Sequence, residues 1–304
     1  MCNPCITLKA FAREFKTHND RLRMFAAAKT NSKWPYVFGT SPWFPETSST
    51  LAICRTVLAA IQVVHLVWNF SMHFEGGFWF IYLTHLTQTI VTAYSVFACL
   101  TAWRALPKLR EKGPSKSEET RLPWFVSTSW ALFHVAMPAA LLVVVLYWTL
   151  DNPVWNLKFV PAYMGFYVHG IIFVLLLVDL FLGRNVFYLK HVVFFFAYVL
   201  SYLIWSIVHG ALDIGKYDGC DAYPDKEDCP IYGVLDWNKP KAAGILSVII
   251  IFFVVPLCQY PLWWCVFKRR LADFVAHHED ESKDESRGTS ASAADKDAEL
   301  DVVA

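Results

Sequence analysis

The sequence predicts an all-α fold, a six-helix transmembrane bundle with both termini cytosolic. Of its 304 residues 56% are hydrophobic and only 17% are charged, whereas soluble domains average about 25% charged residues. The apolar residues form long blocks, and lysine and arginine are concentrated in alternate segments between them. These features exclude an ordinary soluble protein. A net charge of +1 also lacks the basic signature of a nucleic-acid-binding protein.

Six apolar blocks are long enough to cross a bilayer, whose core of about 30 Å requires roughly 20 helical residues. They are Leu51–Phe70, Phe78–Trp103, Trp124–Trp148, Pro161–Leu182, His191–Ala211 and Ala243–Phe267. Tryptophan recurs near the block ends, where amphipathic rings prefer the membrane interface. The sequence therefore predicts a transmembrane domain over residues 50–270, an N-terminal cytosolic segment over 1–49 and a disordered acidic cytosolic tail over 271–304.

The distribution of positive charge predicts the orientation of the bundle. Lysine and arginine are frequent before the first block, between the second and third, between the fourth and fifth, and after the sixth. In a six-pass chain these four segments lie on one side, and the positive-inside rule assigns that side to the cytosol. The remaining loops are poor in basic residues, and the loop over 213–241 is acidic on balance.

The segment before the first block lacks the apolar core of a cleavable signal peptide, so we expect the first spanning helix to direct insertion. No endoplasmic-reticulum retention tetrapeptide ends the sequence. The predicted location is an integral, multi-pass position in the plasma membrane, with the endoplasmic reticulum as the alternative.

Two cysteines, Cys220 and Cys229, fall in the longest predicted outer loop. An outer loop faces an oxidising compartment, where a disulfide between them is expected. A metal site is the alternative, but two cysteines without histidines at ligand spacing are too few. We therefore predict no metal site.

Polar side chains recur on one face of most predicted helices, and buried ionisable groups in a membrane are functional candidates by default. Each alone is commonly a hydrogen bond that fixes helix packing. Taken together, they predict a polar cavity. They include Gln62, His65 and Asn69, then Thr84, Gln88 and Thr92, then Ser127 and His134, then Tyr198, Tyr202 and His209.

Depth separates these residues into two groups. Counted along the helix axis, Thr84 lies about 10 Å below the outer end of the second block and His169 about 12 Å below that of the fourth. His65 and His209 also belong to the outer half. Near the inner face, Arg55 and Asp179 have similar depth, and we expect a structural ion pair because a lone buried charge is costly.

A hydroxyl and an imidazole at one depth are the minimum for nucleophilic catalysis, in which the histidine takes the hydroxyl proton and the oxygen attacks a carbonyl. The candidates are Thr84 and His169. Gln88, one turn from Thr84, is a candidate donor to the oxyanion. With His65, His209 and Tyr202 it would form a supporting polar pocket.

Three stretches resemble the rolling stone family of membrane proteins, which is named for a fly protein implicated in myoblast fusion. They are Phe80-Ile-Tyr-Leu-Thr84-His85, Tyr167-Val-His169-Gly170 with Asp179, and Ile231-Tyr-Gly-Val-Leu-Asp-Trp-Asn-Lys-Pro240. The pattern is more distantly similar to the androgen-induced membrane hydrolases, which hydrolyse fatty-acid esters of hydroxy fatty acids with an intramembrane threonine and histidine. That similarity implies Thr84 as nucleophile and His169 as base.

Two functions follow as hypotheses: an intramembrane threonine-dependent lipid-ester hydrolase, and a non-catalytic protein of cell adhesion or myoblast fusion. A di-haem electron carrier would require paired histidines on facing helices, but the candidate histidines lie at unmatched depths. A transporter would require discontinuous helices at matching positions in the two halves of the chain, and the sequence shows no such pair. We predict no cofactor and no nucleic-acid partner. Membrane lipids, with a lipid ester as candidate substrate, are the predicted partners, and the sequence identifies no protein partner.

Overall fold

The structure is a computed structural model that describes residues 34–111, 122–151, 162–216 and 229–266, and within these ranges it contains helices, turns and loops but no strands. Six helices are long and apolar enough to cross a membrane: Thr50–His73, Leu83–Arg110, Trp124–Asp151, Tyr163–Leu182, Leu189–Ala211 and Pro240–Val266. The predicted all-α membrane fold is confirmed at this level. The cytosolic placement of the termini stays a prediction. Residues 1–33 and the whole predicted tail lie outside the described part of the chain.

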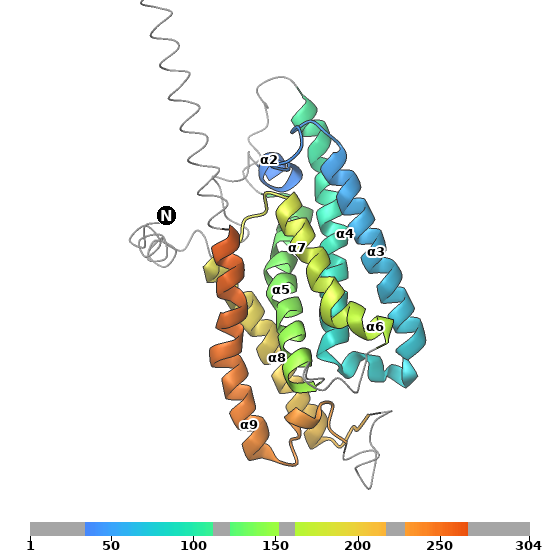
Figure 1. Cartoon of the computed structure of the whole chain (residues 1–304), viewed down its shortest axis with the longest axis vertical. Helices are drawn as coiled ribbons and strands as arrows, with labels where there is room; N and C mark the ends of the chain where they lie inside the picture. Colours follow the sequence, from blue (N-terminus) through green and yellow to red (C-terminus); the bar gives the residue numbers. More distant parts are fainter. Residues whose placement is uncertain (1–33, 112–121, 152–161, 217–228, 267–304) are drawn as a thin grey trace, which may run out of the picture. The chain divides into compact units, whose positions relative to one another are not determined.

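The chain divides into a unit over Met1–Tyr260 and a second unit over Pro261–Ala304, of which the structure describes the helical residues 261–266. In the first unit α4 (Leu83–Arg110) has neighbours on several sides. It packs against α3 (Thr50–His73) and α5 (Trp124–Leu146), and α2 (Trp34–Gly39) lies near its C-terminal end (Figure 1).

The remaining membrane helices contain turns of other kinds. α5 continues into a π-helical turn, η3 (Tyr147–Asp151). α6 (Tyr163–Phe166) joins α7 (Ile172–Leu182) through a second π-turn, η4 (Tyr167–Ile171). Further along the chain come η5 (Leu189–His191), α8 (Val192–Ala211), η7 (Gly233–Leu235), α9 (Pro240–Ile249) and a third π-turn, η8 (Ile250–Val254). α9 begins at a proline. Proline suits the first position of a helix because the N–H at that position would have no hydrogen-bond partner within the helix.

The start of the second spanning helix differs from the prediction. Residues Glu75–Ile81 form a 3-10 segment, η2, and Tyr82 is extended with φ −87° and ψ 128°, so α4 begins at Leu83. Thr84 is consequently in the first turn of this helix, and the expectation of a continuous α-helix from Gly77 was wrong. The depth of Thr84 in the membrane stays a prediction. At its other end α4 runs beyond Trp103 to Arg110, where long basic side chains can reach polar surroundings.

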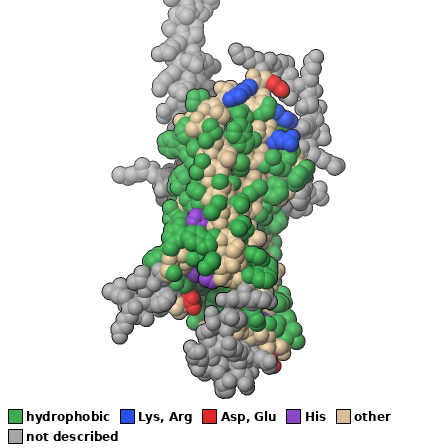
Figure 2. Space-filling view, turned by 90° about the vertical axis from the view of Figure 1, so that its right-hand side faces the viewer, with side chains coloured by type: hydrophobic (Ala, Val, Ile, Leu, Met, Phe, Trp, Pro, Cys, Tyr) green, Lys and Arg blue, Asp and Glu red, His purple; other side chains and the backbone are tan. Residues whose placement is uncertain are grey.

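The outer surface of the helices is largely apolar, as a lipid-facing surface requires. Large hydrophobic side chains are exposed along several helices, including Val64 on α3, Val174 on α7 and Phe252 in η8. Figure 2 shows apolar side chains over the middle of one face, with lysine and arginine gathered at one end. Inside, α4, α5, α8 and the α9 span contribute to a common apolar cluster that includes Leu142, Phe195 and Val199.

Candidate functional site

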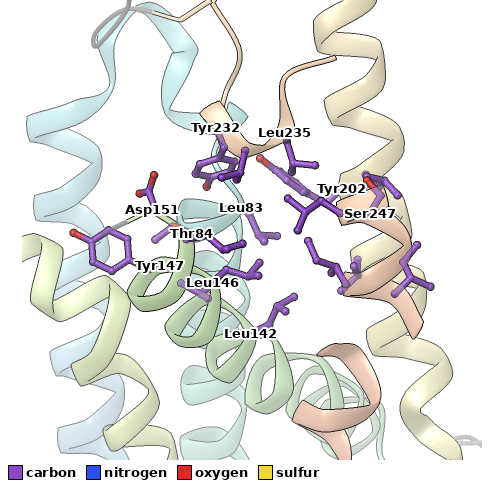
Figure 3. Close-up of a pocket in the computed structure, with 18 of the residues that line it drawn as sticks. Leu83, Thr84, Leu142, Leu146, Tyr147, Asp151, Tyr202, Tyr232, Leu235 and Ser247 are labelled. Carbon is purple, nitrogen blue, oxygen red and sulfur yellow. The ribbon is translucent and has the colours of Figure 1, made fainter. Parts of the chain in front are cut away.

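A cavity of about 80 Å³ lies where α4 begins and α5 ends. Its wall is mostly leucine, valine and isoleucine from α5, α8, α9, η7 and η8, which suits a hydrocarbon chain. Polar groups are also present on the wall. Figure 3 labels Thr84, Tyr147, Asp151, Tyr202, Tyr232 and Ser247. His169 also lines the cavity.

Thr84 and His169 meet at this cavity although 85 positions separate them in the chain. The Thr84 Oγ1 and His169 Nε2 atoms are 3.2 Å apart, within the range expected for a nucleophile and its base. His169 Nδ1 lies 2.9 Å from the Gly165 carbonyl oxygen, to which it can only donate. The Nε2 atom is then the unprotonated nitrogen and accepts the Thr84 hydroxyl proton.

Three contacts hold His169, two at its imidazole ring and one at its backbone. Its ring stacks on Tyr147 with centroids 3.5 Å apart and planes 6° from parallel. Its own carbonyl accepts a hydrogen bond of 2.8 Å from Trp148 Nε1. With the Gly165 contact, these interactions fix both the ring position and the tautomer, a task that a carboxylate performs in many catalytic triads.

Each of the three π-helical turns in the described residues contributes to the cavity wall. η3 supplies Tyr147 and Asp151, η4 supplies His169, and η8 supplies Ile250 and Ile251. Single π-turns are rare and occur frequently at functional sites, because the widened turn redirects side chains that a regular helix would place elsewhere. Their convergence on one cavity distinguishes this region from ordinary helix packing.

The N-terminus of α4 adds favourable electrostatics at Thr84. The first turn of a helix carries unpaired N–H groups and a partial positive charge, and α4 has no acidic residue in its first turn. Thr84 itself is buried at 8% exposure. A negative charge developing beside its oxygen would therefore lie close to helix N–H groups.

Of the four residues predicted to form a supporting pocket, the structure places only Tyr202 on the cavity wall. The amide oxygen of Gln88 accepts a 2.5 Å hydrogen bond from Asn69. His65 stacks on Tyr167 at 3.8 Å. His209 donates to the Gly215 carbonyl at 2.7 Å and borders a separate polar hollow. His65 and His209 were grouped with the site by depth and Gln88 by its place one turn from Thr84, but neither criterion determines the direction in which a side chain points.

Arg55 and Asp179 are brought together at 2.7 Å between Nε and Oδ1, and both are buried. The guanidinium also donates to the Phe38 carbonyl at 2.7 Å and to Asn185 at 3.1 Å. Tyr94 donates a short hydrogen bond to the second carboxylate oxygen. Neither charged residue borders the cavity of Thr84, so this network joins α2, α3, α4 and α7 without contact with the candidate site.

Two buried histidines form a second pair. His134 Nδ1 donates to the Trp130 carbonyl at 2.9 Å, and its Nε2 lies 3.0 Å from His191 Nδ1. Because the rings are hydrogen-bonded directly, no iron fits between them, which argues against a haem at this pair. Within the described residues no cluster of three or more His, Cys, Asp and Glu side chains could hold a metal ion.

The predicted Cys220–Cys229 disulfide stays a prediction, because Cys220 lies outside the described residues. Cys229 is described and is buried.

Several wall residues were not anticipated from the sequence. Tyr147, Asp151 and Ser247 come from helix ends or apolar stretches that carry no pattern of their own. Tyr232 lies in the Ile231–Pro240 stretch that carried the family resemblance. The resemblance therefore marked the stretch that contains Tyr232, but nothing in the sequence showed that this stretch lies beside the start of α4.

Comparison with known proteins gives one informative similarity. The chain is 20% identical over 240 residues to Protein rolling stone of Drosophila melanogaster, covering 77% of this chain and 82% of that protein. No protein-family model matches the chain. No solved structure matches it either. Taken with the six membrane-spanning helices, the similarity identifies the chain as an integral, multi-pass membrane protein related at a distance to rolling stone.

Proposed function

We propose that this protein is an intramembrane lipid-ester hydrolase in which Thr84 is the nucleophile and His169 the general base. The observation that carries the proposal is the 3.2 Å contact between Thr84 Oγ1 and His169 Nε2 on the wall of an apolar cavity. A substrate dissolved in the bilayer would place its acyl chain among the aliphatic side chains and its ester carbonyl beside Thr84.

The reaction would proceed by acyl transfer. His169 Nε2 takes the proton of Thr84 while Oγ1 bonds to the ester carbonyl carbon, and the carbonyl electron pair moves to oxygen. When the carbonyl re-forms, the bond to the alcohol oxygen breaks and the alcohol takes the proton from His169. A water molecule, deprotonated by His169, then attacks the acyl-threonine, and Thr84 recovers its proton as the fatty acid leaves.

The chain offers matched controls for both residues. Thr87 lies one turn from Thr84, but its hydroxyl pairs with Tyr198 at 2.8 Å and does not border the cavity. His85 stacks on Trp79 at 4.6 Å and pairs with a backbone carbonyl at 2.8 Å, much as His169 does, but it is not on the wall. Loss of activity specific to Thr84 and His169 would thus report chemistry and not the loss of a buried group.

The test is hydrolysis of a fluorogenic oleate ester and a panel of fatty-acid esters by protein in liposomes. We expect Thr84→Ala and His169→Ala to lower kcat/KM by about 10³-fold or more, the scale of losing a nucleophile or its base. Thr87→Ala and His85→Ala should retain activity within about threefold, and Thr84→Ser should retain part of it.

Folded wild-type protein that hydrolyses none of these esters would contradict the proposal. That result would favour the non-catalytic role in adhesion or cell fusion that the family resemblance implies. In that case the outer loop, with its predicted Cys220–Cys229 disulfide, would be the contact surface.

A further inference from the structure

Tyr232 reaches the nucleophile from outside the helices that build most of the cavity. It precedes the short turn η7, and its ring packs edge-on against Tyr82 with centroids 6.1 Å apart. Figure 3 shows the ring on the cavity wall above Thr84. Its hydroxyl lies within hydrogen-bonding reach of the backbone and side chain of Thr84, and of the Tyr202 hydroxyl.

The segment that carries Tyr232 is anchored at several points, so its position is defined by the fold. Trp237 Nε1 donates to Ser206 Oγ on α8 at 3.1 Å. The same ring packs so closely that a Cβ at Gly210 would lie 3.0 Å from the Trp237 Cβ. Within the segment itself, Asp236 accepts the Asn238 N–H at 3.0 Å and pairs with Lys239 at 3.3 Å, which fixes its local turn.

The hydrogen bonds at Thr84 leave the hydroxyl proton of Tyr232 as the one that can be donated to a substrate. The Thr84 hydroxyl donates to His169 Nε2, so its oxygen can accept a hydrogen bond from the Tyr232 hydroxyl, while the Thr84 N–H donates to the phenol oxygen. When Oγ1 bonds to an ester carbonyl, the negative charge forms on the neighbouring oxygen. The Tyr232 hydroxyl, which contacts Thr84 and lies on the same cavity wall, is then within reach of that oxygen.

We propose that Tyr232 donates the hydrogen bond that stabilises the oxyanion during acyl transfer from a lipid ester to Thr84, a role that rests on the hydrolase function proposed above. The phenol keeps its proton throughout, and the charge returns to the carbonyl when the alcohol leaves. Tyr232 replaces Gln88, which points toward Asn69, as the donor in this reaction.

Two other hydroxyls on the wall are engaged elsewhere. Tyr202 donates its proton to the Ile81 carbonyl at 2.9 Å, so in its contact with Tyr232 it can only accept. Ser247 donates to the Ala243 carbonyl at 2.7 Å. Burial raises the pKa of Tyr232 to about 12, and the nearby Asp151 charge acts in the same direction against the contacts with Thr84. The phenol therefore stays protonated, as a donor must, over the pH range in which the ester assay is run.

The experiment compares Tyr232→Phe with Tyr198→Phe in liposomes containing the fluorogenic oleate ester. Tyr198 is the control because it is a partly buried tyrosine whose hydroxyl pairs with Thr87 at 2.8 Å and which does not line the cavity. We expect Tyr232→Phe to lower kcat by about 10²-fold, as loss of one oxyanion donor does, with little change in KM. Tyr198→Phe should change kcat by less than about threefold, and the pH profile should show no limb from a tyrosine between pH 7 and 10.

A second measurement separates donation from positioning. A long-chain trifluoromethyl ketone adds to a nucleophilic hydroxyl and forms a stable oxyanion, so its affinity should fall in Tyr232→Phe by the same factor as kcat, while the affinity for oleic acid should not change. Tyr232→His, which retains a ring N–H donor, should recover part of the loss.

The two proposals fail in different ways. Active wild-type protein whose Tyr232→Phe variant keeps full kcat, or loses kcat but binds the ketone normally, overturns the role of Tyr232 and leaves the hydrolase intact. Wild-type protein that neither hydrolyses the ester nor forms the ketone adduct overturns both. If Tyr232→Phe does not fold, Tyr232→His with wild-type kcat and weakened ketone binding would likewise contradict the inference.

Discussion

Thr84 and Thr87 are the same residue type on the same helix, yet only Thr84 borders the cavity and meets a histidine. Thr87 faces α8, where it pairs with Tyr198. The pairing of Thr84 with His169 could be predicted from the sequence because both are polar residues at similar distances from the outer ends of their apolar blocks. Tyr232 could not be found this way, because a loop residue has no helical periodicity that defines its direction.

The buried Arg55–Asp179 pair provides a prediction about stability at the same scale. Arg55→Met leaves the Asp179 carboxylate buried without its cation, which should lower the free energy of unfolding by about 3–5 kcal/mol. The double variant Arg55→Met with Asp179→Leu removes both charges and should recover most of that loss. Unfolding in mixed micelles measures both. A double variant less stable than either single one would contradict the interpretation of the pair as a structural element that apolar groups can replace.

At the scale of elements, the helices that follow regular periodicity were predictable, and the irregular turns were not. The lengths of the apolar blocks predicted the bounds of the six membrane spans closely, because burial in lipid depends on amino-acid composition. The 3-10 segment before α4 and the three π-turns depend on which carbonyl each N–H reaches, and hydropathy does not record that choice. These turns place Thr84 and His169, so the detail of the site was the least accessible part of the sequence.

The contact between α2 and α4 gives a prediction for a single element. A Cβ at Gly39 would lie 2.2 Å from the Ala105 Cβ, which has no room to move on a packed helix. Gly39→Ala should therefore cost about 1–3 kcal/mol of stability, as overpacking does. Combining it with Ala105→Gly should restore part of the loss.

Gly244 on α9 is the matched control for this substitution, because a Cβ there meets nothing within 4 Å. Gly244→Ala should leave stability unchanged or raise it by up to about 1 kcal/mol through helix propensity. Equal destabilisation at Gly39 and Gly244, measured by the same unfolding assay, would show that the α2–α4 contact is not close-packed.

At the scale of the whole molecule, the charge pattern predicts how the bundle lies in the membrane. Exposed basic side chains lie near the C-terminal end of α4: Arg104, Lys108 and Arg110. Asp213 lies at an exposed turn just after the C-terminal end of α8. The positive-inside rule places the first group in the cytosol and Asp213 outside. This orientation is a prediction from the sequence alone.

Cysteine labelling of intact cells tests the orientation. Asp213→Cys should react with a membrane-impermeant maleimide beyond the level of the parent protein, and Lys108→Cys should react only after the membrane is permeabilised. The reverse pattern would place the termini and the basic segments outside. It would also place the cavity of Thr84, which lies where α4 begins, on the cytosolic side.

The most direct test of the central claim is to locate the covalent adduct formed in lipid by a long-chain fluorophosphonate, using peptide mass spectrometry. The account predicts one modified residue, Thr84, with modification lost in Thr84→Ala and His169→Ala and retained in Thr87→Ala and His85→Ala. Folded protein that carries no adduct, or carries it at a residue outside the cavity, would contradict the assignment of Thr84 and His169 as a catalytic pair.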